Sequence, residues 1–355
     1  MSSDASGFDS GRSSAWRCAC CPIDIHAHWF PRRWLKELER RGPAHGLHWE
    51  NLEGAGPRFR HGHLSTGPAG PRFIDLEARR EAMVGQGVSA QALSLSQPMV
   101  YWAGHEDGNA LASLYNDCLA EACQAHPEQF VGLATLPMQS VDLTLREIER
   151  LPSLPGIRGV CLATCVLDRD LSDPVFTPVW ERLEALGLPV FLHPTFVLAP
   201  DRLDRFYLTN LLGNPFETAV AAAHLIFGGV LDRFPRLEVV LPHAGGAFPW
   251  LVGRLRRGWE KRADLKPLSA DPVSYLRRFH YDTIGYSADV LDYLLRHVGA
   301  DRIMMGSDYC FPIAYEQPVE IVTAHPGLSE ADQLAILEGN ARRLLQLPST
   351  PSTAA

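Results

Sequence analysis

The sequence has 355 residues, of which 46% are hydrophobic and 21% are charged, proportions that are ordinary for a globular protein. Its formal net charge of −8 argues against nucleic acid or an anionic membrane surface as the main partner. No apolar run approaches the roughly 20 residues that a membrane-spanning helix requires. These properties favour a folded protein that has neither a nucleic-acid nor a membrane partner.

The first residues, Met1–Ser14, are rich in Ser, Gly and Asp and lack the apolar stretch of a signal peptide. We therefore expect a disordered tail over residues 1–20, a second tail over residues 348–355, and a cytoplasmic location. Three cysteines cluster at the end of the first tail, at Cys18, Cys20 and Cys21. They are expected to be free thiols, and a zinc knuckle is disfavoured because no second ligand pair follows at a suitable spacing.

Short apolar runs rich in Val, Ile and Leu recur along the chain, which predicts a parallel sheet that is covered on both faces. Eight such runs favour a closed barrel over an open sheet. The predicted strands are Ile23–His28, Val88–Leu95, Phe130–Leu136, Ile157–Ala163, Pro189–His193, Leu237–Pro242, Phe279–Thr283 and Arg302–Gly306.

Segments with apolar residues spaced near 3.6 lie between these runs and predict helices. They are Asn109–His126, Asp142–Leu151, Val175–Leu186, Pro215–Arg233 and Ala288–Val298, with a last helix from Ser329 to Leu347. The predicted fold class is α/β, with one (β/α)8 TIM barrel over residues 21–347. Such barrels take about 250 residues and accommodate insertions.

One stretch does not follow the alternation of strands and helices. Residues 31–72 are rich in Gly, Pro, His and Arg, and the second strand begins only near Val88. We interpret this stretch as an insertion after the first strand that covers the mouth of the barrel and contains no strand. His61 and His63 repeat the His-X-His spacing there, but without a strand they are not favoured as a metal site.

Polar residues fall where the predicted strands end. The first strand ends in His26-Ala27-His28, and alternate residues of a strand point the same way, so both imidazoles project together. The fifth, sixth and eighth strands end at His193, His243 and Asp308. Because active sites in (β/α)8 barrels are built at the carboxyl ends of the strands, these five side chains predict one site.

A single histidine that closes an apolar strand is more often a hydrogen-bonded core residue than a ligand. His26 and His28 are paired by their spacing, and all five residues share one placement. A role as ordinary core residues is therefore disfavoured for the whole set. The remaining histidines have no shared placement and are interpreted as surface or packing residues.

The motifs around these residues resemble the aminocarboxymuconate-semialdehyde decarboxylase-like branch of the amidohydrolase superfamily. The resemblance runs from about Pro22 to Leu347. It is carried by Ile-Asp-Ile-His-Ala-His, Phe-Leu-His-Pro, Gly-Asn-Pro-Phe-Glu-Thr, Phe-Gly-Gly-Val-Leu-Asp-Arg-Phe-Pro, Leu-Pro-His-Ala-Gly-Gly-Ala-Phe-Pro and Gly-Ser-Asp-Tyr, which occur in this order.

The resemblance implies a site for one metal ion. His26, His28, His193 and Asp308 match the metal ligands of the family, and His243 matches its catalytic histidine. Many amidohydrolases bridge two metals with a modified lysine at the end of the fourth strand, but the segment Ile157–Cys165 contains no lysine. A two-metal site of that kind is therefore excluded. Zinc is the expected ion, and the same ligands accept manganese or cobalt.

The resemblance also implies residues that bind the substrate. Arg254 falls where the family has an arginine that reaches across a dimer interface to a substrate carboxylate, which implies a homodimer. Arg58 is a looser match to a second carboxylate-binding arginine, and an ordinary surface role is the alternative for both. Phe196 stands where the decarboxylase has an acidic residue, and Tyr207 stands near the place of a substrate-lining tryptophan.

The predicted function is non-oxidative decarboxylation of an unsaturated or aromatic acid, with an ortho-hydroxy or ortho-amino group. A metal-bound water, oriented by Asp308, and the imidazole of His243 would supply the acid–base chemistry. The alternative is a mononuclear hydrolase or hydratase that acts on a cyclic amide, lactone or related substrate, because both reactions can start from the same ligand set. A non-catalytic metal-binding protein is disfavoured because His243 is present.

Overall fold

The structure is a computed structural model that describes residues 21–265 and 268–348. Within these residues, eight strands form one parallel sheet in the order β1-β5-β6-β7-β10-β11-β12-β13. The bounds are Ile23–His28 (β1), Ala90–Ser94 (β5), Phe130–Ala134 (β6), Ile157–Ala163 (β7), Val190–His193 (β10), Val239–Leu241 (β11), Phe279–Asp282 (β12) and Ile303–Met304 (β13). All eight predicted strands are confirmed.

The sheet closes on itself between its last and first strands. The backbone N–H of Ile25 donates to the carbonyl of Met305 at 3.0 Å, and that of His28 donates to the carbonyl of Tyr309 at 2.7 Å. A parallel bridge joins Ala27 to Tyr309 in the same seam. The predicted TIM-barrel fold is therefore confirmed.

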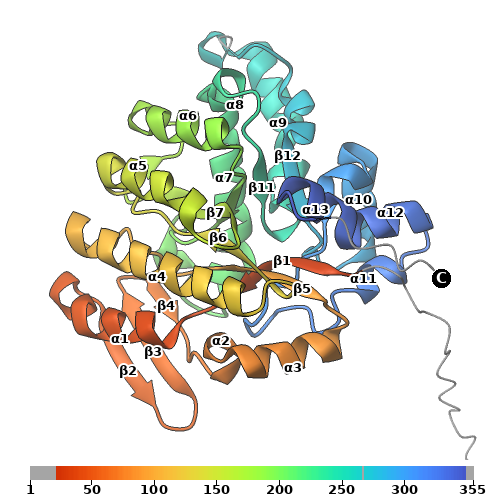
Figure 1. The fold of residues 1–355 in the computed structure, drawn as a ribbon. Coiled ribbons are helices and arrows are strands. Elements are labelled where there is room, and N and C mark those ends of the chain that lie inside the picture. Colours follow the sequence, from red (N-terminus) through yellow and green to blue (C-terminus); the bar gives the residue numbers. More distant parts are fainter. Residues whose placement is uncertain (1–20, 266–267, 349–355) are drawn as a thin grey trace, which may run out of the picture.

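Helices surround the outside of this sheet (Figure 1). Their bounds are Arg32–Arg41 (α1), Pro71–Ile74 (α2), Leu76–Gln86 (α3), His105–Ala125 (α4), Val141–Arg150 (α5), Thr177–Leu186 (α6), Asn214–Phe227 (α7), Val230–Arg233 (α8), Phe248–Lys261 (α9), Ala288–Val298 (α10), Glu320–Thr323 (α11), Glu330–Leu334 (α12) and Asn340–Leu344 (α13). No helix in the described part of the chain is long and apolar enough to cross a membrane.

Local sequence signals account for where these elements begin and end. The side chain of Asp75 caps α3 by accepting hydrogen bonds from the backbone N–H groups of Glu77 and Ala78 at 2.9 and 3.3 Å. Gly87 ends the same helix in the left-handed conformation, at φ +69°. All six residues of β1 are buried, as expected for a strand covered on both faces.

The insertion after β1 differs from its prediction. It contains α1 and an antiparallel sheet of three strands, His48–Leu52 (β2), Gly56–His61 (β3) and Leu64–Thr66 (β4). The prediction of no strand was wrong because one face is polar, while Trp49 and Phe59 stack on the other with ring centroids 5.7 Å apart. His61 is the last residue of β3 and His63 directly precedes β4, so the two histidines flank the turn between these strands.

The small sheet contacts loops that follow two barrel strands. The hydroxyl of Thr66 donates to the carbonyl of Gln97, in the loop after β5, at 3.1 Å. His63 Nε2 lies 3.5 Å from Asp201 Oδ1, in the loop after β10. These contacts place the sheet at the rim of the face where the carboxyl ends of the strands lie. That it covers the mouth stays a prediction.

Two predicted helices are interrupted. The helix expected over Pro215–Arg233 divides into α7 and α8, because Gly229 adopts φ +69° between them. The last helix, expected from Ser329, divides into α12 and α13 around a π turn over Ala335–Gly339. The described cysteines, Cys21 included, are free. The predictions for Cys18, Cys20 and residues 1–20, and for all but the first residue of the second tail, lie outside the described residues.

Candidate metal centre

Four side chains from three parts of the barrel converge at the carboxyl ends of its strands. His26 and His28 come from β1, His193 is the last residue of β10, and Asp308 follows β13. One potential ligand atom from each lies within 4.8 Å of the others, and all four residues are buried. In residues 21–265 and 268–348 this is the only group of its kind.

The donor atoms of this group fit a divalent cation. Nε2 of His26 and Nε2 of His28 lie 3.1 Å apart, and they lie 3.6 and 3.3 Å from Oδ1 of Asp308. This oxygen is buried without a hydrogen-bond donor in the described chain. Three imidazoles and one carboxylate are a donor set suited to zinc and related transition-metal ions.

Two polar side chains orient the imidazoles from behind. Nδ1 of His26 lies 2.8 Å from Oδ2 of Asp282, and Nδ1 of His28 lies 3.0 Å from Oγ of Ser94. Because each Nδ1 is engaged in this way, each Nε2 is left to face the centre of the group. Sequence reasoning missed Asp282 and Ser94, although each falls at the end of a predicted strand.

His243 lies beside the group without belonging to it. Its Nε2 is 3.8 Å from Oδ2 of Asp308, and its ring centroid is 5.2 Å from that of His26. Its Nδ1 is buried and has no hydrogen-bond partner among the described residues. The side chain is 11% exposed, so it contacts the group on one side and is open to the mouth of the barrel on the other.

Burial and neighbouring charges set the protonation states of the group. Burial lowers the pKa of His28 to about 4 and lowers that of His193 well below its ordinary value. Burial alone would raise the pKa of Asp308, but the neighbouring imidazoles of His243, His28 and His26 hold it well below its ordinary value. Neutral imidazoles and an ionised carboxylate are the forms that bind a metal ion.

His26 differs from the other two histidines. Burial alone would lower its pKa, but its hydrogen bond to Asp282 and the charge of Asp308 outweigh burial and raise it. Its proton would therefore be released when an ion binds.

Two of the predicted substrate-binding residues lie near the group. Tyr207 is half-exposed, has φ +60°, and has a pKa raised by burial and by the negative charge of Asp308. Phe196 follows His193 by three residues and packs, partly buried, against the core. These positions are compatible with walls of a substrate pocket.

The two predicted arginines are not brought to the group by this single chain. Arg58 lies on β3, where its Nη1 is 3.8 Å from Oε2 of Glu50. Arg254 lies exposed on α9 and has no ion-pair partner in the described residues. No hydrogen bond or ion pair within the described chain joins either arginine to the four converging residues, so their roles stay predictions.

Two further tyrosines at the mouth were not predicted. Tyr286 follows β12, is half-exposed at φ +53°, and packs against the tilted ring of Tyr315 at a centroid distance of 4.9 Å. Burial and the charges of Asp308 and Asp282 raise the pKa of Tyr286. Both tyrosines lie in loops after the carboxyl ends of strands, and that placement is a signal by which sequence reasoning could have found them.

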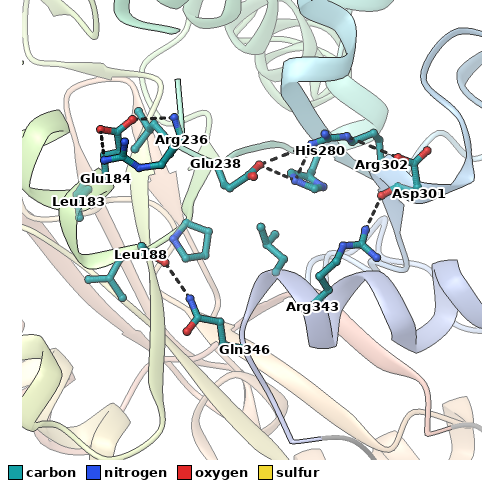
Figure 2. Close-up of a pocket in the computed structure, with 14 residues that line it drawn as sticks. Leu183, Glu184, Leu188, Arg236, Glu238, His280, Asp301, Arg302, Arg343 and Gln346 are labelled. Atoms are coloured by element: carbon teal, nitrogen blue, oxygen red, sulfur yellow. Dashed lines mark hydrogen bonds and ion pairs between the residues drawn. The ribbon is translucent and has the colours of Figure 1, made fainter. Parts of the chain in front are cut away.

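A second cleft lies at the opposite end of the barrel, beside the amino ends of β10 to β13 (Figure 2). Its charged side chains pair with one another. Nε2 of His280 lies 2.9 Å from Oε2 of Glu238 and 3.2 Å from Nη1 of Arg302, and Arg236 pairs with Glu184 at 3.1 Å. None of the predicted site residues lines this cleft.

Comparison with known proteins agrees with this geometry. The family model described as amidohydrolase matches residues 23–347. A 2-amino-3-carboxymuconate-6-semialdehyde decarboxylase from Dictyostelium discoideum is 30% identical over 328 residues, covering 92% of this chain and 91% of that one.

Solved structures match over a similar range. 5-Carboxyvanillate decarboxylase from Sphingomonas paucimobilis matches at 27% identity with a TM-score of 0.80, covering 93% of this chain and 100% of that one. A dihydroxybenzoic acid decarboxylase from a Polaromonas species, solved with manganese and 2-nitroresorcinol, matches at 25% identity with a TM-score of 0.76, covering 95% and 100%. The chain thus belongs to the amidohydrolase family and to its aminocarboxymuconate-semialdehyde decarboxylase-like group.

Proposed function

We propose that this chain is a metal-dependent, non-oxidative decarboxylase of an unsaturated or aromatic carboxylic acid. An acid with an ortho-hydroxy or ortho-amino group is the preferred substrate class. The observation that carries the proposal is the buried group of three histidines and one carboxylate, with His243 beside it. The named decarboxylases that match nearly the whole chain support it.

His26, His28, His193 and Asp308 would hold one divalent ion. We propose zinc as the ion because three imidazoles and one carboxylate are donors that suit it. Manganese, which is bound in the structure of the Polaromonas relative, and cobalt bind the same kinds of donor. When bound, the ion supplies positive charge that polarises the substrate and stabilises the negative charge that develops as CO2 leaves.

His243 would deliver the proton that the reaction needs. The bond between the substrate carbon and its carboxylate breaks, CO2 leaves, and the electron pair stays on that carbon until it is protonated. Nε2 of His243 would give this proton and take another from solvent, to which the side chain is partly open. Asp308, 3.8 Å away, would orient the imidazole. No oxidant or reductant is required.

The mouth of the barrel would select the substrate. Tyr207 and Phe196 would line the pocket, where aromatic rings suit a planar unsaturated acid. Arg58 and Arg254 would bind its carboxylate, because a guanidinium group binds a carboxylate through two parallel hydrogen bonds.

We also propose that the chain forms a homodimer through an apolar surface beside the mouth. This surface, which we call the α7–α9 face, is an apolar groove whose lining includes Leu212, Phe216, Leu251 and Leu255. Leu212 is 45% exposed and Phe216 is 49% exposed. Exposed apolar side chains that line one groove favour a protein partner. Arg254 flanks this face on α9, between Leu251 and Leu255.

Metal content and CO2 release together test the proposed function. We expect about one divalent ion per chain, and CO2 from one or more ortho-hydroxy or ortho-amino aromatic acids or muconate semialdehydes. A chelator should abolish the release, and the ion should restore it. One ion per chain with turnover of lactones or cyclic amides and no CO2 would replace the decarboxylase by a hydrolase. Protein that binds no ion after reconstitution would contradict the metal site itself.

A further inference from the structure

A buried arginine lies behind the metal centre. Arg79, on α3, has no solvent exposure, and no carboxylate of the described chain lies within ion-pair distance of it. Its Nη2 donates to the carbonyl oxygens of His28 and Arg72, and its Nη1 donates to Oε1 of Gln91 at 3.0 Å. Its guanidinium carbon also lies 4.9 Å from the ring centroid of Tyr309. The cation therefore contacts the backbone of a metal-ligand residue directly.

Gln91 connects this cation to a buried anion. Gln91 is fully buried on β5, and its Nε2 donates to Oδ2 of Asp24 at 3.1 Å. Asp24, on β1, is also fully buried, and it is the register partner of Gln91. One side-chain amide thus joins a guanidinium to a carboxylate, with its oxygen toward the positive group and its nitrogen toward the negative one.

Asp24 in turn holds the backbone beside two other ligand residues. Its Oδ1 accepts from the N–H of His26 at 3.1 Å and from the N–H of Ser307 at 3.0 Å. Its Oδ2 accepts from the hydroxyl of Ser307 at 2.5 Å, and the oxygen of that hydroxyl accepts from the N–H of Tyr309 at 3.0 Å. The residues on both sides of Asp308 are therefore tied to β1.

We propose that Arg79, Gln91 and Asp24 act together as positioning residues that set the affinity of the metal centre. The three side chains, which we call the Arg79–Asp24 relay, clamp the backbone at His26, at His28 and around Asp308. The relay contacts neither the ion nor the substrate. This inference rests on the proposed metal-binding role of those residues.

The buried hydrogen bonds of the relay explain why it would be sensitive to substitution. Removing Arg79 would leave the carbonyl oxygens of His28 and Arg72 and Oε1 of Gln91 without this buried donor, which is costly inside a protein. The site would then relax towards solvent, and the backbone that carries His26 and Asp308 would move with it. Polar groups that orient metal ligands typically contribute about 10-fold to 100-fold in metal affinity.

The test is the dissociation constant for zinc and for manganese, measured on metal-stripped protein by competition with a chelating dye. Arg79→Met keeps an unbranched apolar stem and removes the guanidinium group, and we expect it to weaken binding about 10-fold to 100-fold. Arg80→Met is the matched control, because Arg80 lies on the same helix and pairs with the exposed Glu77. The control should bind both ions as the parent chain does.

Gln91→Met is the second variant. It keeps both charges but breaks the relay between them, so we expect it also to weaken binding. If circular dichroism shows that Arg79→Met does not fold, the dissociation constant measured for Gln91→Met tests the inference instead. Unchanged affinity in a folded Arg79→Met or Gln91→Met protein would overturn the inference, and so would the failure of both to fold, which would assign the relay to fold stability alone. A parent chain that binds no ion would instead overturn the proposed function.

Discussion

At the scale of single residues, the centre combines strained backbone with a carboxylate that holds it. His243, Ala244 and Asp308 all have positive φ, at +56°, +56° and +61°. Such conformations cost about 1–3 kcal/mol each and persist where the surroundings enforce them. Asp282 accepts from the N–H groups of His243 and Ala244 at 2.9 and 2.7 Å while it also contacts His26. One buried carboxylate thus fixes both a ligand residue and the proposed proton donor.

The role of His243 can be separated from its unusual backbone. His243→Asn should keep the fold and the metal, because asparagine tolerates positive φ. It should lose about 100-fold or more in kcat, since the amide cannot transfer a proton at neutral pH. The measurements are metal content and CO2 release, with His126→Asn at the end of α4 as the control. Near-parental kcat in His243→Asn would remove His243 from the proton transfer.

The same residues show how far the sequence can predict the centre. The placement of His26, His28, His193, His243 and Asp308 follows from where apolar runs end, and the structure brings all five together. The contacts behind them depend on pairing between strands: Ser94 reaches His28 because the two are register partners. Register is not visible in a single sequence, so the pairing of these supporting residues with particular ligands could not be predicted.

At the scale of elements, long buried runs were predictable and half-buried ones were not. The eight barrel strands were found because both of their faces are apolar. The strands β2 to β4 were missed because one of their faces is polar, so their composition looks like that of a loop. The π turns over Thr209–Gly213 and Ala335–Gly339 leave no distinct sequence signal, because an α-helix and a π turn bury the same kinds of side chain.

An ion pair at the amino end of the barrel predicts a stability change with pH. The hydrogen bond from His280 lowers the pKa of Glu238, so the pair stabilises the fold above about pH 4.3, the ordinary value for glutamate. That stabilisation is lost as the pH falls through the lowered pKa of the folded state. Because Glu238 is 45% exposed, water screens the pair, and its contribution is on the order of 1 kcal/mol or less.

Urea unfolding of Glu238→Gln between pH 3 and pH 7 tests this pair. The variant should be less stable than the parent at pH 7, and the difference should shrink as the pH falls towards 3. Glu53→Gln, at an exposed position of the insertion, is the control and should follow the parent throughout. A Glu238→Gln deficit that is constant over this range would show that the charge of Glu238 does not stabilise the fold.

At the scale of the whole molecule, the two ends of the barrel carry different kinds of polar group. The carboxyl end gathers the metal ligands, His243 and three tyrosines, whereas the amino end carries paired charges (Figure 2). The α7–α9 face lies beside the first of these ends, so a second copy bound there would come close to the mouth. A homodimer would then bring Arg254 of one chain towards the mouth of the other, whereas within the described residues of one chain Arg254 has no ion pair with the metal group.

Mixing two inactive variants tests whether Arg254 acts across such an interface. Arg254→Ala and His243→Asn should each be inactive alone. If Arg254 serves the partner's site, a mixed dimer holds one site with an intact His243 and an intact Arg254 from the other chain. Unfolding and refolding a 1:1 mixture should then restore about a quarter of parental activity, since half of the dimers are mixed and each has one competent site. If Arg254 serves its own chain, every site in the mixture lacks one of the two residues, and no activity returns.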